Sequence, residues 1–206
     1  MNRHAITHLN SDPVMAGLIE KVGPIRLHPR RLSPFQSLAH AIIHQQLNST
    51  AAGTILERFK RLFPDDAFPA PGQVAKASVD RLRTAGLSRP TASYIIDLAR
   101  HCDAGLIPSL SDCDALKDED IIATLTAIKG IGRWTVEMSL IFNLGRPDVL
   151  PVHDLGVRRG FQIAYRKRSM PTPEQLAKHG VRWAPHRTTA ARYLWRAVDS
   201  AVNPNW

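Results

Sequence analysis

The sequence lacks the features that identify several large classes of protein. It contains two cysteines, Cys102 and Cys113, and neither belongs to a Cys-x-x-Cys pair, so counting excludes a disulfide framework and a four-cysteine zinc site. No run of about 18 apolar residues is present, and residues 1–4 do not lead into the apolar segment of a signal peptide. We therefore expect neither a membrane span nor secretion, and we expect a cytoplasmic protein.

Histidine is plentiful, but its spacing does not indicate a metal site. Among the nine histidines, His40 and His44 lie four residues apart on a predicted helix. They lack the companion carboxylate that metalloprotease spacing requires. We interpret both as surface or pocket-rim residues.

Patterns typical of strands are missing as well. No alternating apolar and polar segment of useful length and no internal repeat occurs, whereas apolar residues recur at helical spacing along most of the chain. The sequence therefore predicts an all-α fold. The predicted helices cover residues 12–22, 34–44, 49–63, 71–77, 78–85, 91–102, 118–127, 132–142, 154–165, 173–179 and 187–201.

Acidic residues are scarce in the C-terminal quarter of the chain. From Val152 to Trp206 there are ten Lys and Arg against three Asp and Glu, whereas the preceding residues hold 17 basic and 15 acidic side chains. The formal net charge of +9 is therefore concentrated in this segment. It indicates either a solvated basic face or a polyanionic partner. The second interpretation is favoured if the chain also holds an anion-binding motif, such as the one predicted for residues 125–136. It predicts an affinity for DNA that falls as the salt concentration rises.

Residues 125–136 carry the most informative motif. Gly130 and Gly132 lie one residue apart between the helix-periodic segments 118–127 and 132–142. Glycines permit a tight turn and a close approach of backbone to a ligand, and a helix that starts at about Gly132 directs its unpaired N–H groups outward. The segment is typical of a helix-hairpin-helix that binds a nucleic-acid backbone. A plain turn between helices is the alternative.

A carboxylate follows about twenty residues later. Residues 148–156 place Asp154 after an apolar turn, at the predicted start of helix 154–165. Aspartate at this position is either a catalytic group or a helix N-cap, for which it is a preferred residue. The two roles are compatible in one side chain.

Three motifs together resemble one family. The hairpin core at 129–135, the Asp154 motif at 151–156 and the segment 39–47 occur in the order and rough spacing of the helix-hairpin-helix (HhH-GPD) superfamily of DNA glycosylases. Within it, the chain is most similar to the 3-methyladenine DNA glycosylase II (alkylbase glycosylase) branch. The similarity extends over about residues 34–200, which is nearly the whole chain.

The resemblance implies a fold of two helical bundles with an active-site cleft between them. The central bundle would cover residues 35–143 and contain the hairpin at about 118–142. The second bundle would comprise residues 1–34 plus 144–206 and carry the catalytic aspartate.

The resemblance also implies a reaction. An ionised Asp154 would stabilise positive charge on the deoxyribose, or orient water, while the N-glycosidic bond of a flipped alkylated purine is hydrolysed. Expected substrates are 3-methyladenine, 7-methylguanine and related bases. Relatives that also cut the strand use a lysine on the second hairpin helix, where this chain has Trp134, so no Schiff base is expected. We therefore expect a monofunctional glycosylase that leaves an abasic site.

Aromatic side chains match the base pocket of the family. Trp134 and Trp195, with Tyr193 as a further neighbour, would prefer cationic alkylated bases through stacking and cation–π attraction of about 0.5 to 2 kcal/mol per contact. Core packing is the alternative for each of them, and we interpret Trp183 as structural.

The remaining positions implied by the resemblance concern the DNA. Gln46 or Leu47 would be the wedge that fills the gap left by the flipped base. The alternative is that Gln45 and Gln46 cap the end of the preceding helix. The residues expected to contact the DNA backbone are Gly130, Gly132, Arg133 and Thr135. The backbone carbonyls expected to hold a monovalent cation, Na⁺ or K⁺, are those of Thr126, Ile128 and Ile131.

The expected partner is double-stranded DNA that contains alkylated bases, bound by a monomer associated with the nucleoid. No organic cofactor is expected, and two cysteines cannot hold the four-cysteine iron–sulfur cluster of some relatives. Two alternatives remain open at the level of sequence. One is a non-catalytic helix-hairpin-helix module that binds lesions, and the other is a glycosylase for oxidised or mismatched bases.

Overall fold

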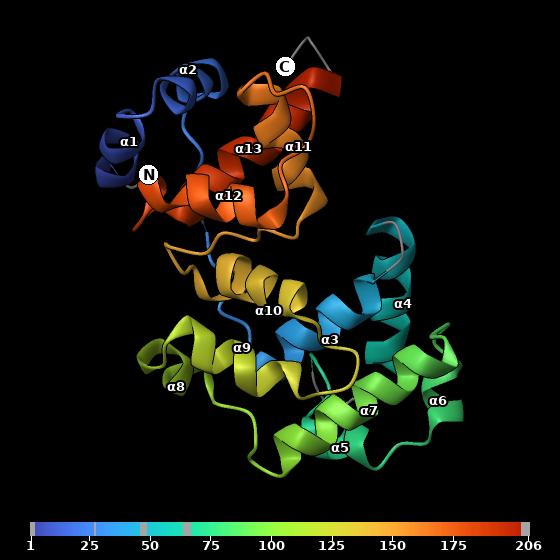
Figure 1. Ribbon diagram of the computed structural model, residues 1–206. Coiled ribbons are helices and arrows are strands. Elements are labelled where there is room, and N and C mark those ends of the chain that lie inside the picture. Colours follow the sequence, from blue (N-terminus) through green and yellow to red (C-terminus); the bar gives the residue numbers. More distant parts are fainter. Residues whose placement is uncertain (1–2, 27, 46–48, 64–66, 203–206) are drawn as a thin grey trace. The chain divides into compact units, whose positions relative to one another are not determined.

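The computed structural model describes residues 3–26, 28–45, 49–63 and 67–202, and the regular elements in these ranges are helices (Figure 1). The prediction of an all-α fold is confirmed for this part of the chain. The chain divides into two compact units, the first formed by Met1–Pro29 with Leu140–Trp206 and the second by Arg30–Ser139. Within the described ranges, no helix is long and apolar enough to cross a bilayer.

Each unit is assembled from short helices. The first unit contains α1 (Arg3–Leu9), α2 (Pro13–Val22), the π-helical segment η1 (Leu140–Leu144), α11 (Leu155–Ala164), α12 (Pro173–Gly180), the 3-10 turn η2 (Val181–Trp183) and α13 (Arg187–Val202). The second unit contains α3 (Pro34–His44), α4 (Ser49–Arg61), α5 (Pro71–Ala75), α6 (Val79–Arg83), α7 (Arg89–Asp103), α8 (Leu110–Ala115), α9 (Asp118–Thr126) and α10 (Arg133–Ser139).

Several helices begin with the same local device, a polar N-cap followed by a proline in the first turn. Asp12, Ser33, Ser88 and Thr172 each accept a hydrogen bond from a first-turn amide, at the starts of α2, α3, α7 and α12. The cap satisfies an amide that has no partner within the helix, and proline fixes a helical φ angle where its missing N–H costs nothing. This is why the starts of these helices are readable from the sequence.

In the second unit, α7 lies at the centre and packs against α3, α5 and α6. The hairpin helices α9 and α10 pack against each other, and α10 also packs against α3. The arrangement buries an apolar core whose members include Phe35, Leu38, Ile42, Phe59, Leu82, Ile95, Leu98, Ile121 and Val136. The hairpin is therefore attached to the core of this unit along one helix.

In the first unit, α11 packs along α13, and α2 covers both helices. A buried carboxylate links α2 to this core: Asp12 accepts hydrogen bonds from Tyr165 Oη at 2.5 Å and from Trp183 Nε1 at 3.3 Å. Burial opposes ionisation of Asp12, but these bonds and two from backbone amides outweigh it, and its pKa lies below the ordinary value. Trp183 is fully buried, which confirms its interpretation as structural.

Two helices, α1 and α8, are not predicted from the sequence. Each is short and buries few apolar side chains, so no hydrophobic period marks it. A local signal does exist for α8, because Ser109 and Asp112 form a reciprocal capping box. The second hairpin helix, predicted at 132–142, is α-helical only over α10 and continues as the π-helical segment η1.

Candidate active site and nucleic-acid interface

Asp154 is the N-cap of α11. Its backbone is extended, with φ −68° and ψ 122°, and its Oδ1 accepts a hydrogen bond of 2.7 Å from the amide of Val157. The N-cap role weighed from the sequence is therefore confirmed. The cap also fixes the χ angles of the carboxylate, so the same bond that starts the helix orients the group expected to act in catalysis.

A second donor reaches the same oxygen. The indole Nε1 of Trp195, on α13, donates a hydrogen bond of 2.8 Å to Asp154 Oδ1. The Trp195 ring is stacked on Phe142 of η1, with centroids 5.6 Å apart and an angle of 26° between the planes. The structure thus brings together two residues predicted for the site, Asp154 and Trp195, and adds Phe142, which the sequence analysis did not single out.

Gly156 makes this contact sterically possible. A Cβ atom at Gly156 would lie 2.9 Å from Trp195 Cδ1 and 3.1 Å from Asp154 Oδ1, both closer than ordinary van der Waals contact. Any side chain here would push the indole away from the carboxylate. The glycine that ends the 151–156 motif is therefore required by the aspartate–tryptophan pair.

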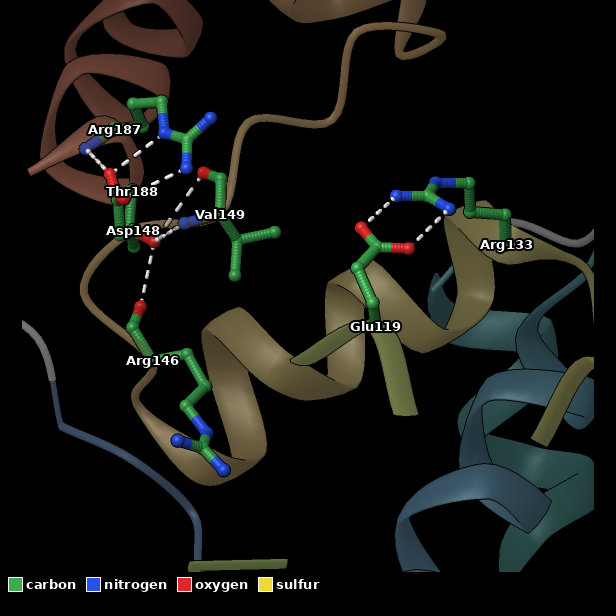
Figure 2. A network of polar contacts seen from close by, with 7 residues as sticks. All are labelled: Glu119, Arg133, Arg146, Asp148, Val149, Arg187 and Thr188. Carbon is green, nitrogen blue, oxygen red and sulfur yellow. Dashed lines mark hydrogen bonds and ion pairs between the residues drawn. The ribbon is translucent and has the colours of Figure 1, made fainter. Parts of the chain in front are cut away.

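The segment that leads to Asp154 is held by the start of α13 (Figure 2). Arg187 donates to both carboxylate oxygens of Asp148, from Nε and Nη2, each at 2.8 Å. Thr188 Oγ1 donates to the carbonyl of Arg146 at 2.7 Å and accepts from the amide of Val149 at 2.9 Å. The same helix therefore anchors the segment before Asp154 and supplies the indole that touches it.

The Asp148–Arg187 pair is partly buried. Burial is the largest single influence on Asp148 and opposes its ionisation, but the side-chain and backbone hydrogen bonds from Arg187 together outweigh it. The pKa of Asp148 consequently lies below its ordinary value. The pair stays charged at neutral pH and keeps its bidentate geometry.

The assignment of Tyr193 to the base pocket is corrected by the structure. Tyr193 is fully buried in the core of the first unit, and its hydroxyl donates to the carbonyl of Gly23 at 3.0 Å. It lies two residues before Trp195 on α13, and two residues along a helix correspond to a rotation of about 200°, so the two rings face different sides. A side chain with no exposed surface has no face to offer a base.

In the second unit, the turn between α9 and α10 depends on Gly130. Its φ is +81°, a conformation that glycine adopts at little cost, and a Cβ atom there would overlap the ring of Tyr94 on α7. Gly132 differs, because a Cβ atom there would meet no atom within 4 Å. The open space at Gly132 lies on the face where the sequence predicts contact with DNA.

Two side chains from other helices hold this turn. Gln45, the C-cap of α3, donates from Nε2 to the carbonyl of Gly130 at 3.0 Å. Asp97 of α7 accepts from the amide of Lys129 at 3.3 Å. The interpretation of Gln45 as a helix cap is correct for its backbone, while its side chain supports the hairpin. Gln46 and Leu47, the predicted wedge, lie outside the described residues.

Arg133 and Glu119 link the two hairpin helices (Figure 2). The guanidinium of Arg133 binds both carboxylate oxygens of Glu119, at 2.5 and 3.0 Å, and its Nε donates to Glu137 at 3.1 Å. The hydrogen bonds from Arg133 lower the pKa of Glu119. These ion pairs give Arg133 a role inside the hairpin that the sequence analysis did not foresee, and its contact with DNA stays a prediction.

The other predicted residues of the hairpin differ in exposure. Trp134 is 47% exposed although it is a large apolar residue, as expected for a surface that meets a ligand. Thr135 is buried, and its Oγ1 lies 3.5 Å from Gln45 Nε2, so its side chain belongs to the support of the turn. Ile128 and Ile131 are anchored by buried side chains, and the amide of Ile131 donates to the carbonyl of Ile128. In the described part of the chain, no group of three or more His, Cys, Asp or Glu side chains is arranged to hold a metal ion.

Comparison with known proteins gives consistent matches. Residues 39–186 match the family model described as "HhH-GPD superfamily base excision DNA repair protein". A Schizosaccharomyces pombe protein named DNA-3-methyladenine glycosylase 1 is 39% identical over 186 residues, which cover 89% of this chain and 82% of the relative.

Two solved structures are similar over nearly their full length. An S. pombe 3-methyladenine DNA glycosylase in complex with abasic DNA superposes with a TM-score of 0.86 and 36% identity, covering 98% of this chain and 99% of that chain. A DNA-3-methyladenine glycosidase from Bacillus halodurans gives a TM-score of 0.86 and 37% identity, covering 95% and 89%.

Proposed function

Because the chain belongs to the HhH-GPD superfamily of base excision DNA repair proteins, we propose that it is a monofunctional DNA glycosylase that removes alkylated purines, such as 3-methyladenine and 7-methylguanine, from duplex DNA. Relatives at 36 to 39% identity carry the name of this activity. The partner is double-stranded DNA, and the similar S. pombe structure holds abasic DNA, the product of such a reaction.

The observation that carries the proposal is the held carboxylate of Asp154. Two N–H donors, the amide of Val157 and the indole of Trp195, end on its Oδ1. Two donors on one oxygen fix the orientation of the carboxylate, which places it to stabilise a positive charge that develops on the sugar. A carboxylate held in one orientation loses little entropy when the substrate arrives.

In the proposed reaction the bond between C1′ of the deoxyribose and the purine nitrogen breaks, and its electron pair leaves with the base. An alkylated purine is cationic, so it departs as a neutral base. Asp154 stabilises the positive charge that develops on the sugar, water adds at C1′, and the water proton is released. The step needs no metal in this scheme and leaves an abasic site.

The position used for strand cleavage by some superfamily members is taken by Trp134, which has no amine to form a Schiff base. The half-exposed indole offers a π surface to a cationic base instead. Borohydride is therefore expected to trap no covalent protein–DNA adduct, and recovery of one would contradict a monofunctional mechanism.

The hairpin is the proposed contact with the DNA backbone. Amides near Gly130 and Gly132 would face a phosphate, and the carbonyls of Thr126, Ile128 and Ile131 would hold a monovalent cation that bridges to the same strand. Backbone carbonyl oxygens are hard donors suited to Na⁺ or K⁺, and the buried side chains of Ile128 and Ile131 keep two of them in place.

The decisive experiment is base release from methylated duplex DNA, with the freed bases identified by chromatography. Asp154→Asn keeps an oxygen that can cap α11 and removes the charge, so base release is expected to fall by about a thousandfold or more, within the range assigned to one electrostatic group. Binding to DNA with an abasic analogue should stay within about threefold. Release by the variant at the wild-type rate would refute the role of Asp154, and tight lesion binding without release by the wild-type protein would identify a non-catalytic module.

A further inference from the structure

A hollow of about 300 Å³ lies in the first unit, and none of its lining residues is used in the proposed mechanism. It is bordered by the C-terminal end of α2, the segment that follows this helix, and one face of α13. The lining residues are Lys21, Val22, Pro24, Ile25, Arg26, Arg192, Arg196 and Asp199. We call this hollow the α2–α13 pocket.

The α2–α13 pocket is strongly basic. Four of its lining side chains are cationic, those of Lys21, Arg26, Arg192 and Arg196. One lining side chain, that of Asp199, is acidic. Asp199 lies 3.3 Å from Arg196 as an i, i+3 pair, with the two side chains 53% and 45% exposed. Exposed pairs of this kind contribute about 0 to 1 kcal/mol, so a stronger anion can replace the carboxylate.

Arg192 is the most enclosed of these cations. Its Nη2 donates to the carbonyl of Arg26 at 2.9 Å, which fixes the guanidinium against the segment after α2. Burial, and then the charge of Arg196, lower the pKa of Arg192. Two like charges held side by side repel each other, and an anion that binds between them relieves this repulsion.

The walls of the pocket are preorganised. Tyr193 Oη donates to the carbonyl of Gly23, so α13 also holds the start of the segment that follows α2. Arg192 and Arg196 are one helical turn apart on α13 and therefore project on the same side. The bond to Arg26 uses one of the five N–H groups of the Arg192 guanidinium, and the fork geometry of this group matches the oxygens of a phosphate.

We propose that the α2–α13 pocket is a binding site for a phosphate group. The tetrahedral anion would lie between the guanidinium groups of Arg192 and Arg196, with Lys21 as the third cation. The group has two sources with the same chemistry, a backbone phosphate of DNA or a free phosphate such as inorganic phosphate or the phosphate of a nucleotide. The site does not depend on the glycosylase activity, because it shares no side chain with the proposed reaction.

The first experiment uses inorganic phosphate as the probe and the full ¹⁵N-labelled chain. At constant ionic strength set with NaCl, phosphate should produce saturable NMR shifts of the Arg192 side-chain Nε–H and of the amides of residues 21–23, 25 and 26. The variant Lys21→Glu/Arg196→Glu should bind at least about tenfold more weakly, because two of three charge-assisted contacts become repulsive. The variant Lys178→Glu/Arg182→Glu reverses two exposed charges on α12 and η2 and is expected to bind as the wild type does.

The second experiment distinguishes the two sources by the salt dependence of affinity for undamaged duplex DNA. If the pocket binds a DNA phosphate, the slope of log Kd against the logarithm of salt concentration should be smaller by about 0.9 in Lys21→Glu/Arg196→Glu than in the control variant Lys178→Glu/Arg182→Glu. Equal slopes, together with phosphate shifts, identify a free phosphate as the ligand.

Two outcomes would overturn the proposal. One is a phosphate titration that reproduces the NaCl blank. The other is a titration in which both double variants bind phosphate equally. Arg192→Lys serves as a further variant that keeps the charge and removes the fork, and it should bind phosphate more weakly than the wild type while melting at a similar temperature. Base release by Asp154→Asn at the wild-type rate, which would refute the proposed role of Asp154, would leave these phosphate results unaffected, so the two proposals fail separately.

Discussion

Trp195 and Asp154 form a hydrogen bond of 2.8 Å between the indole Nε1 and the carboxylate Oδ1, across 41 residues of sequence. The bond joins the middle of α13 to the N-cap residue of α11, and the room for it comes from the missing side chain at Gly156. Trp195, which the sequence analysis assigned to the base pocket, therefore also orients the carboxylate of Asp154, the group proposed to act on the sugar. Several expectations about activity depend on this relationship.

Trp195→Phe removes the indole N–H and keeps an aromatic ring. A hydrogen bond to a charged acceptor contributes about 1.5 to 3 kcal/mol, so kcat for base release should fall by about 10- to 100-fold. Affinity for abasic-site DNA should change by less than about threefold, because the phenyl ring still stacks. Single-turnover kinetics and an equilibrium binding assay separate the two effects. Phe142→Leu, which removes the stacked neighbour and leaves the donor in place, is the matched control, and a larger loss of kcat in it than in Trp195→Phe would contradict the role of the N–H.

Gly156→Ala tests the same pair from the other side. The added methyl group would lie 2.9 Å from Trp195 Cδ1, so the indole must move and the bond to Asp154 lengthens or breaks. We expect kcat to fall at least as far as in Trp195→Phe, with a loss of unfolding free energy of about 1 to 3 kcal/mol from overpacking. The double variant Gly156→Ala/Trp195→Phe should lose little more activity than either single variant. Additive losses would show that the glycine acts independently of the indole.

The two hairpin glycines should respond differently to alanine. At Gly130 the φ of +81° and the ring of Tyr94 oppose a Cβ atom, so Gly130→Ala should lower the melting temperature by several degrees, for a cost of roughly 1 to 3 kcal/mol. At Gly132 a Cβ atom meets no neighbour, so Gly132→Ala should melt within about 2 °C of the wild type and still weaken DNA binding, if backbone and phosphate approach each other there. Equal melting temperatures for both variants would contradict the structural distinction. Unchanged DNA affinity of Gly132→Ala would remove it from the proposed interface.

His40 predicts a pH dependence of stability. Its ring lies against Phe68, and its Nε2 is buried without a hydrogen-bond partner, which places it deeper than the surface or rim position expected from the sequence. Burial, followed by the charges of Lys60, His44 and Arg30 and opposed by Glu57, lowers the pKa of His40 to about 4. The unfolded chain takes up this proton at a higher pH, near 6.5. The contribution of His40 to the free energy of unfolding is therefore fully present above about pH 6.5. It declines as the pH falls towards 4 and does not change further below that pH.

The corresponding loss is on the order of 1 to 3 kcal/mol across this interval. His40→Leu should flatten the decline when chemical denaturation is measured between pH 7 and 4, and it should leave stability at pH 7 unchanged or improved, because no buried nitrogen remains unpaired. Parallel curves for the variant and the wild type would show that His40 does not cause the dependence.

The parts of the molecule that were predictable from the sequence are those with a local cause. Polar caps followed by prolines mark helix starts, and α3 spans the residues predicted for it, Pro34 to His44. The N-cap position of Asp154 follows from its place before an apolar helix, and a turn near Gly130 follows from the paired glycines. In each case a few neighbouring residues decide the conformation.

What could not be predicted depends on contacts between distant residues. Tyr193 and Trp195 are both aromatic and lie on the same helix, so the sequence does not indicate which of them is buried in the core. The ion pair of Arg133 with Glu119 joins α10 to α9, two helices that the sequence treats separately. The contribution of Phe142 depends on η1, because a π-helical turn has no simple period in the pattern of apolar residues.

The π-helical segment sets a narrow tolerance for length. A π turn contains one more residue than an α turn, and each residue inserted into or removed from a helix rotates everything beyond it by about 100°. Phe142 lies inside η1, so trimming residues 140–144 by one to restore regular winding would swing its ring off the indole of Trp195. Surface loops accept insertions and deletions readily, but we expect residues 140–144 not to tolerate them. In this segment the number of residues, rather than the chemistry of the side chains, sets the orientation of Phe142 against Trp195.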